Sequence, residues 1–455
     1  MKMTDKNPSA FSVAVIGAGP AGLFAARELA TAGVPVVLFN RDIKAGGLAE
    51  YGIYPSKLKM KDGLRRQFRQ ILDLPKVNYI GNLPISLDDE ISLADLQAMG
   101  FDAVLVTVGA QGTKRLGLPG EDLPGVYHAK DLVYHYNHLP PFSQQSFPFG
   151  KRVVCIGVGN VMLDIAHWAV RTLKVEELIA IARRGPADVK FSKKEMETVA
   201  RNLDLAALDA EFERTAPVMR AIGQDPEAAK AFILSALENA EEPVSETRFE
   251  LDFLISPKRI LTDGRGQVRA LEVEETTLVA RPDGGSKAVD LGKSHEIACD
   301  TVVFCIGDRV DDGLGLPLDK WGDFAKNPNP SFPVDETSYE AFNPELQQPL
   351  AGVFLAGWAR EASSGLVGVA RKDGTNAARA LLGYLETVTP KGKAATEALA
   401  SKVAHLGRPI VNKADLATLA AAEAAQAAEL DLPEFKFDSN EEMLAVMGKL
   451  QIERS

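Results

Sequence analysis

Three features are scarce in this 455-residue sequence, and each scarcity excludes a class of protein. There are only three cysteines, Cys155, Cys299 and Cys305, and no Cys-x-x-Cys pair, so neither a dithiol redox centre nor a cysteine-ligated iron–sulfur cluster is expected. No run of about 18 apolar residues occurs, which argues against a membrane-spanning helix. The formal net charge of -11 argues against a general nucleic-acid-binding protein. We expect a cytosolic protein whose thiols pack in its core.

The composition is that of an ordinary globular protein. The chain is 46% hydrophobic and 25% charged, and its length allows two or three domains. Composition therefore narrows the class of protein, but the function has to be inferred from sequence motifs.

The first motif is SVAVIGAGPAGLFAARELATAGVPVVLFN, residues 12–40, which predicts a strand, a glycine turn, a helix and a second strand. Gly17, Gly19 and Gly22 have the G-x-G-x-x-G spacing of a dinucleotide-binding turn. The first glycine permits the tight turn, the second lets backbone approach a pyrophosphate, and the third lets helix and strand pack closely. The second strand ends on Asn40, where such sites usually place an acid that holds the ribose.

A second strand, turn and helix follow in KRVVCIGVGNVMLDIAHWAV. This turn has Gly157 and Gly159 but lacks the third glycine, so its spacing alone leaves nucleotide binding open. The next strand ends on Arg183 and Arg184, where an NAD site places an acid. Guanidinium groups suit a 2′-phosphate, so the pair predicts NADP. Two arginines in a surface turn are the structural alternative.

These patterns predict an α/β fold with two Rossmann-like dinucleotide-binding domains, the second inserted into the first. A later buried strand at 353–360, followed by a helix, returns to the first sheet. The predicted boundaries are 1–112 and 331–388 for the first domain, 113–330 for the second, and 389–455 for a helical and extended tail that packs on the first domain.

The chain resembles the adrenodoxin-reductase-type ferredoxin–NADP reductases, which are also related to the glutamate synthase small subunit. The motifs that carry the resemblance are GAGPAG, GGLAEYGI, TVGAQGTKRLGLPGE, GVGNVMLD followed by ARRGPADVKFSKKE, LAGWAREASSGLVG and the tail GRPIVNKADL…EEMLAVMG. The resemblance implies FAD in the first domain, NADP(H) in the second, and electron transfer between NADPH and a ferredoxin-type iron–sulfur carrier, in either direction.

The resemblance also implies which residues hold the cofactors. Those implied for FAD are Gly17, Gly19, Ala21, Gly22, Asn40, Leu48, Trp358, Gly365, Leu366 and Val367. Those implied for NADP are Gly159, Asn160, Val161, Arg183, Arg184 and Glu195, with Gly365 near the nicotinamide. No catalytic acid or base is predicted, because hydride transfer to a flavin needs none.

Three positions depart from the family pattern. Asn40 replaces the ribose acid, Lys57 replaces a histidine after the loop proline, and Glu361-Ala362-Ser363 replaces a basic-Gly-Pro segment. An amide can still donate to and accept from a ribose hydroxyl, so FAD binding is still expected at Asn40.

A basic segment follows the GGLAEYGI motif in an otherwise acidic chain. Its residues are Lys57, Lys59, Lys61, Arg65, Arg66 and Arg69, against the single acid Asp62. This segment predicts either a docking patch for an acidic electron carrier or a solvated helix face. The histidines His128, His135 and His138 have helical spacing but no fourth ligand nearby, so no metal site is predicted.

Two other functions stay open at this point. The chain could be the electron-input subunit of a larger complex, like the glutamate synthase small subunit, although the cysteine-rich module of that subunit is missing here. It could also be a non-catalytic nucleotide-binding sensor, for which the substitutions at Asn40 and Lys57 and the altered segment at Glu361-Ala362-Ser363 are the support.

Overall fold

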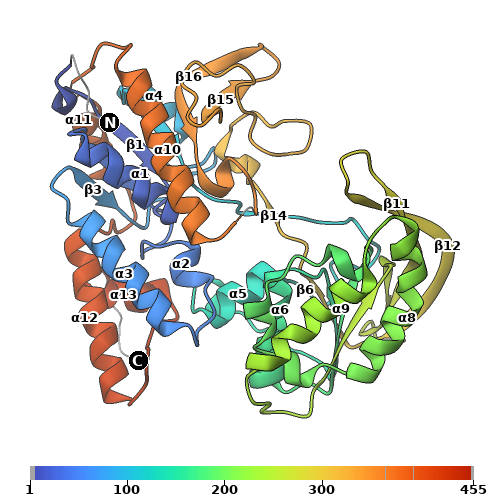
Figure 1. Cartoon of the computed structure of the whole chain (residues 1–455). Helices are drawn as coiled ribbons and strands as arrows, with labels where there is room; N and C mark the ends of the chain where they lie inside the picture. The colour runs from blue at the N-terminus through green and yellow to red at the C-terminus, as the bar shows by residue number, and fades with distance from the viewer. Residues whose placement is uncertain (1–5, 364, 393, 452–455) are drawn as a thin grey trace. The chain divides into compact units, whose positions relative to one another are not determined.

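The computed structural model describes residues 6–363, 365–392 and 394–451. They form two compact units (Figure 1). The first unit consists of the chain up to Thr113, Tyr134–Gln144 and the chain from Asp308 onward, and the second of Lys114–Val133 and Gln145–Gly307. In this described part of the chain, no helix is both long and apolar enough to cross a membrane.

The first unit is built on a six-stranded sheet with the order β15-β16-β4-β1-β2-β3. Its strands are β1 (Val13–Ile16), β2 (Val36–Phe39), β3 (Val77–Ile80), β4 (Ala103–Val106), β15 (Glu340–Asn343) and β16 (Gln348–Leu355). All neighbours pair in parallel except β15, which pairs antiparallel with β16. The strand near the end of the chain therefore does return to the first sheet.

Helices cover both faces of this sheet. They are α1 (Pro20–Thr31), α2 (Leu48–Tyr51), α3 (Leu58–Leu72), α4 (Leu93–Met99), α10 (Val367–Leu385), α11 (Ala394–Val403), α12 (Lys413–Glu429) and α13 (Asn440–Val446). Val13 and Val15 pack in one core with α1 and α10, whereas Ala14 and Ile16 pack in a second core with α4 and α11. Burial on both faces explains why the strands read as continuous apolar runs.

The second unit repeats this plan. Its five-stranded parallel sheet has the order β6-β13-β7-β8-β9. The strands are β6 (Val126–His128), β7 (Arg152–Ile156), β8 (Glu177–Ala182), β9 (Arg248–Phe253) and β13 (Thr301–Phe304). Its helices are α6 (Asn160–Trp168), α7 (Lys193–Met196), α8 (Leu205–Ala221) and α9 (Pro226–Leu234), while α5 (Ala129–Tyr136) runs from this unit into the first. The predicted α/β architecture is confirmed.

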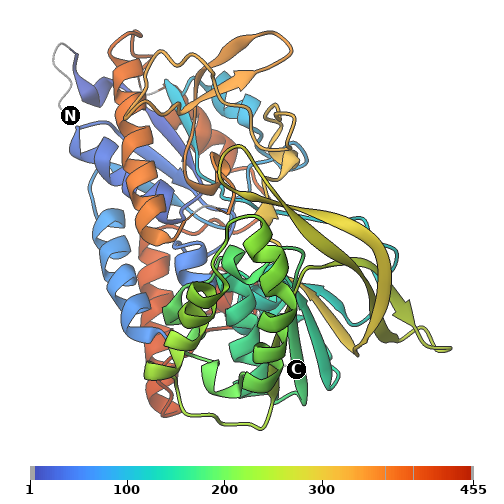
Figure 2. The same ribbon diagram turned by 45° about the vertical axis from the view of Figure 1, so that its right-hand side comes forward.

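An antiparallel ribbon extends the second unit, and Figure 2 shows its long twisted strands in yellow. It consists of β10 (Ile255–Thr262), β11 (Val268–Ala280) and β12 (Ser286–Ala298), in that order. Most residues of β12 are exposed, so this strand lacks the apolar alternation by which a half-buried strand is recognised in a sequence.

The units divide the chain differently from the predicted boundaries. The second unit ends at Gly307 rather than at residue 330, because Val310, Leu314 and Phe324 pack in the core of the first unit. The chain also enters the first unit at Tyr134–Gln144, where Tyr134 and Leu139 pack with Tyr51. A two-stranded pair, β5 (Gly112–Thr113) and β14 (Asp308–Arg309), forms where the chain leaves and rejoins this unit.

The close packing of α1 and α10 gives a prediction about stability. A Cβ at Gly374 would collide with the backbone of Ala21, so Gly374→Ala is expected to lower the thermal midpoint clearly. Gly63→Ala, inside α3 with open space around it, is the control, and its gain in helix propensity is up to about 1 kcal/mol. Differential scanning calorimetry compares the two variants, and equal midpoints would contradict the packing argument.

Candidate functional site

The first glycine turn connects β1 to α1. Gly17 has φ +106°, and a Cβ there would lie 2.5 Å from the carbonyl oxygen of Thr107, while a Cβ at Gly22 would collide with the Gly17 carbonyl. A Cβ at Gly19, by contrast, would meet nothing within 4 Å, and no side chain caps the helix there. Packing therefore requires glycine at positions 17 and 22. Gly19 leaves the helix N-terminus open, as a bound pyrophosphate would need. Ala21, inside the helix, is buried.

The second glycine turn has the same construction. Gly157 has φ +117°, and a Cβ there would collide with the carbonyl oxygen of Cys305, whereas Gly159 faces open space and no side chain caps α6. Met162, at the place of the missing third glycine, is fully buried. The helix therefore accepts a side chain at this position, and the turn keeps its open N-terminus without the third glycine.

The arginine pair lies at the same edge of the second sheet as the second glycine turn. β8 runs parallel to β7 and ends at Ala182, so Arg183 and Arg184 follow it at the carboxyl ends of the strands. Arg183 is exposed, and Arg184 lies 3.5 Å from the carboxylate of Asp188. This is the edge at which ligands bind in open α/β sheets.

A short loop joins the other predicted NADP residues. The backbone N–H of Ser192 donates to Oδ1 of Asn160 over 2.8 Å, and the hydroxyl of Ser192 accepts from the backbone N–H of Glu195. Val161 is 40% exposed in the first turn of α6. The structure thus brings Gly159, Asn160 and Glu195 together through Ser192, a residue that the sequence patterns did not single out.

The amide of Asn40 is engaged by the chain itself. Its Oδ1 accepts from the backbone N–H of Ala18 over 3.1 Å, and its Nδ2 donates to the carbonyl oxygens of Asp42 and Lys44 over 2.8 and 2.9 Å. The side chain is buried. Asn40 therefore ties the glycine turn to the following loop, a role that an acid could not fill because a carboxylate has no N–H to donate.

The segment around Trp358 is held by a buried ion pair. Trp358 lies in a 3-10 turn, Gly357–Ala359, whose first N–H donates to Asp373 over 2.6 Å. The same carboxylate accepts hydrogen bonds from Nε and Nη2 of Arg360. Sequence reasoning missed Asp373, which is buried on α10 together with Asn376.

Of the three residues predicted to lie near the flavin ring, Gly365, with φ +72°, and Leu366, with 71% of its surface accessible, are exposed. Val369, which was not part of the prediction, is 52% exposed. Val367 is half-buried, and Leu48, on α2, packs partly against the Tyr51 and Tyr134 cluster. Ser364 of the same motif lies outside the described residues. Apolar side chains left open at a helix start fit a planar apolar group that would cover them.

The basic segment divides into two sets, and its interpretation as one outward patch is wrong. Lys61 is 0% exposed and pairs with Glu434, and Arg65 makes two hydrogen bonds to Glu50 and pairs with Glu434. The residues that remain outside are Lys57, which is half-buried, and Lys59, Arg66 and Arg69, which are exposed. Two of the six cations therefore form ion pairs inside the protein, because acids from other parts of the sequence lie next to them.

Glu50 is the centre of this interior charge cluster. It is 3% exposed and pairs with Lys44 at 3.2 Å, Lys436 at 3.1 Å and Arg65 at 2.7 Å. Burial alone would raise the pKa of Glu50, but the three cations together hold it well below its usual value. Lys44 also pairs with Glu423 on α12. The cluster joins four distant segments of the first unit.

Lys436 has an unusual pKa for a lysine in this cluster. Burial is the largest cause, and together with charge repulsion from Lys61 and Lys44 it lowers the pKa of Lys436 to about 7, against the attraction of Glu50 and Glu434. The four lysine and arginine side chains of the cluster face Glu50, Glu423 and Glu434, and Arg65 also pairs with the exposed Asp62.

The histidines do not converge. His128 lies in the second unit with its ring stacked on Phe304, and in the first unit Nδ1 of His135 lies 3.0 Å from the Phe142 carbonyl oxygen. His138 pairs with Asp438. Among the described residues, no group of three or more His, Cys, Asp or Glu side chains is placed to hold a metal ion.

The three cysteine thiols are buried. Burial raises the pKa of Cys299 to about 12 and raises that of Cys305 as well. Such thiols stay protonated near neutral pH and are poor nucleophiles. They belong to the packing of the second sheet.

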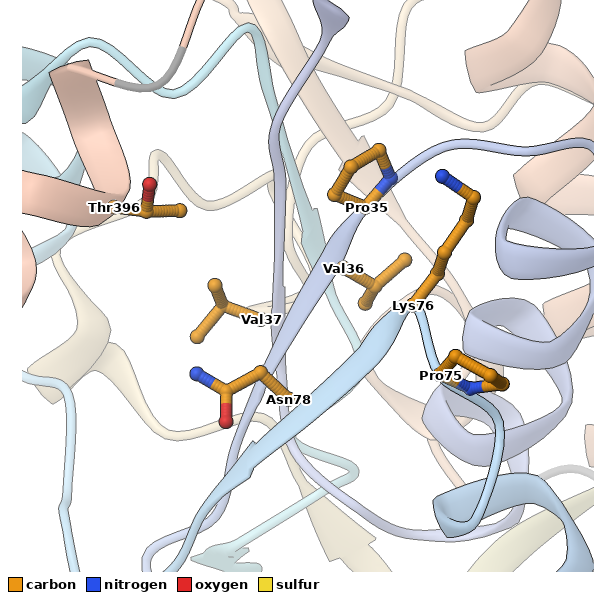
Figure 3. Close-up of a pocket in the computed structure, with 7 residues that line it drawn as sticks. All are labelled: Pro35, Val36, Val37, Pro75, Lys76, Asn78 and Thr396. Atoms are coloured by element: carbon orange, nitrogen blue, oxygen red, sulfur yellow. The ribbon is translucent and has the colours of Figure 1, made fainter. Parts of the chain in front are cut away.

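A shallow pocket on the first unit lies away from the glycine turn. Figure 3 shows its lining residues, which include Pro35, Val36, Lys76 and Thr396, around a volume of about 310 Å³. Val36 begins β2 and Lys76 precedes β3, so the pocket lies at the amino ends of these strands. Ligands of open α/β sheets bind at the opposite edge, so this pocket is not a candidate cofactor site.

Known proteins are similar to this chain over most of its length. The family described as pyridine nucleotide-disulphide oxidoreductase matches residues 11–203. NADPH-ferredoxin reductase FprA of Mycobacterium leprae is 28% identical over 390 residues, which is 79% of this chain and 81% of that protein. The mitochondrial NADPH:adrenodoxin oxidoreductase of Salvelinus fontinalis is 27% identical, over 83% of this chain and 79% of that one.

The same relationship appears in three dimensions. FprA of Mycobacterium tuberculosis superposes with a TM-score of 0.79 at 26% identity, over 96% of this chain and 99% of that one. The chain is a homologue of the adrenodoxin-reductase-type ferredoxin–NADP reductases. Like them it is a two-domain oxidoreductase, and the predicted resemblance is confirmed.

The titration of Lys436 in this reductase homologue gives a prediction about pH. Between pH 7 and 9 the unfolded chain keeps the Lys436 proton, whereas the folded chain releases it, so its contribution to the free energy of unfolding rises with pH. From pH 7 to 9, the wild type should gain up to about 2 kcal/mol relative to Lys436→Met. Denaturant unfolding of both proteins at the two pH values tests this, and parallel pH profiles would contradict it.

Proposed function

We propose that this protein is an FAD-dependent NADPH:ferredoxin-type oxidoreductase. The observation that carries the proposal is the pair of open glycine turns, each at the uncapped start of a helix and each in its own unit. Two such turns suit two dinucleotides. The names of the homologues, NADPH-ferredoxin reductase and NADPH:adrenodoxin oxidoreductase, support the same activity.

The first unit would hold FAD. Its pyrophosphate would lie against Gly17, Gly19, Ala21 and Gly22, where the open Gly19 and the uncapped helix suit an anion. The exposed Leu366 and Val369 suit a flavin ring. The other residues assigned to FAD are Asn40, Leu48, Trp358, Gly365 and Val367, and Asn40 would act mainly by fixing the loop behind the turn.

The second unit would hold NADP(H). Gly159, Asn160 and Val161 open α6 and would receive the pyrophosphate, with Glu195 joined to them through Ser192. Arg183 and Arg184 would contact the 2′-phosphate through forked, charge-assisted hydrogen bonds. A structure of FprA in complex with NADPH, with a TM-score of 0.78 and 25% identity to this chain, supports the assignment.

When bound, FAD supplies the chemistry, accepting a hydride from reduced nicotinamide and passing electrons singly to a carrier. The protein's own residues bind and orient the cofactors, and none is assigned as a catalytic acid or base. In this proposal the carrier is an acidic iron–sulfur protein. Its proposed docking surface is formed by the exposed Lys59, Arg66 and Arg69 of the basic segment, together with the half-buried Lys57.

The first experiment is visible absorption of the purified protein under argon, before and after one equivalent of NADPH, with NADH in parallel. A flavin spectrum that bleaches quickly with NADPH and slowly with NADH is the expected result. A colourless protein that FAD does not reconstitute would overturn the proposal and favour a non-catalytic nucleotide-binding sensor. Copurification of a large partner subunit would favour the electron-input subunit of a complex.

Variants of the arginine pair refine this test. Arg183→Ala with Arg184→Ala should raise the KM for NADPH about 10- to 100-fold and leave the KM for NADH nearly unchanged, because a charge-assisted hydrogen bond contributes about 1.5–3 kcal/mol. Arg281→Ala, exposed on the ribbon, is the matched control. An equal change with both coenzymes would contradict the 2′-phosphate assignment.

Charge reversal tests the docking surface. Arg66→Glu with Arg69→Glu should slow reduction of an acidic two-iron ferredoxin about tenfold at low salt and flatten its salt dependence, because electrostatic steering is lost. The rate of flavin bleaching by NADPH should not change. Arg265→Glu with Lys287→Glu, exposed on the ribbon, controls for net charge. An equally slow reduction of the ferredoxin by both double variants would contradict a specific docking patch.

A further inference from the structure

The C-terminal segment places a buried lysine next to the candidate FAD site. Lys436 follows α12 in the chain and is 3% exposed. Besides its ion pair with Glu50, its ammonium donates to the Glu50 carbonyl oxygen over 2.9 Å and to the Asn137 carbonyl oxygen over 3.1 Å. It also lies 5.0 Å from the centre of the Tyr51 ring. One side chain thus joins α2 to the segment Tyr134–Gln144.

Neighbouring residues reinforce this attachment. Glu434 pairs with Lys61 and Arg65 on α3, and Asp438 pairs with His138 and accepts from the Ser143 hydroxyl through its carbonyl oxygen. Residues 434–438 therefore fasten the tail to α3 on one side of Lys436 and to the Tyr134–Gln144 segment on the other. We call residues 434–438 the strap.

The helix that the strap holds lies directly on the first glycine turn. The backbone N–H of Gly46, just before α2, donates to the Ala18 carbonyl oxygen over 2.8 Å, and a Cβ at Gly47 would lie 3.0 Å from the Cα of Gly19. Lys44, in the same loop, pairs with Glu50. The glycine turn, the loop before α2 and α2 itself are thus in continuous contact, and Glu50 connects them to the strap.

We propose that Lys436, acting through Glu50, is a positioning residue that holds α2 against the first glycine turn and thereby sets how tightly FAD is retained. The inference rests on the proposed function, because it takes FAD as the occupant of that turn. Lys436 does not touch the turn. It acts through the backbone and side chain of Glu50, so its removal changes cofactor binding without removing a cofactor contact.

The physical reason is the cost of a loosened buried carboxylate. With Lys436 replaced by an apolar side chain, Glu50 keeps Lys44 and Arg65 but its carbonyl oxygen and that of Asn137 lose a buried donor. The least costly response is for α2 to move so that water reaches these groups. Such a movement also shifts Leu48 and the loop contacts to Ala18 and Gly19.

The test compares FAD release from holoprotein variants. Holoprotein is diluted to nanomolar concentration, and the dissociation constant comes from the rise in fluorescence of free FAD. Lys436→Met is expected to raise this constant about tenfold and to change the vibronic shape of the flavin absorption band. Lys436→Arg should recover most of the affinity. Lys449→Met, which removes a paired lysine from the same tail, should match the wild type.

Each outcome bears on the proposal. Equal FAD affinity of Lys436→Met and wild type overturns it, and so does an equal loss in Lys436→Met and Lys449→Met, which would show only a general loosening of the tail. If Lys436→Met does not fold, Glu434→Gln replaces it, with an expected loss of about threefold, and no loss overturns the proposal. A wild type that binds no flavin would instead overturn the proposed function.

Discussion

The close approach between each glycine turn and the neighbouring strand is the constraint on which the rest of the structure depends. Gly17 lies against the Thr107 carbonyl and Gly157 against that of Cys305, and no side chain fits in either place. Because the turns are pressed against the sheet there, the following glycines, Gly19 and Gly159, face outward at an uncapped helix start.

The sequence was sufficient for the features that depend on local packing. Apolar runs such as 13–16 and 103–106 are buried on both faces of a sheet, so their composition alone identifies them as strands. The start of α3 was harder to place. The helix begins at Leu58, although Lys61 and Gly63 look like loop residues until the acid that pairs with Lys61 is known to be Glu434.

The candidate site shows the same difference between features of consecutive residues and contacts between distant ones. Spacing was enough to find the glycine turns and the arginine pair, since these depend on a few consecutive residues. It could not find Asp373, Ser192 or the Glu50 cluster, whose partners are distant in sequence. Asn40 shows the limit most clearly, because a motif position usually assigned to the ribose here uses all three of its hydrogen bonds to join the turn and the loop.

The strap has a consequence for biosynthesis. The first unit is assembled from three stretches of chain, and the cation that completes its charge cluster is residue 436 of 455. During translation the second unit is complete once Gly307 has left the ribosome, whereas Glu50 lacks one of its buried partners until Lys436 has been made. The first unit to be started is therefore the last to be finished, and nascent chains halted before the strap would leave α2 and its neighbouring apolar surface open to chaperones.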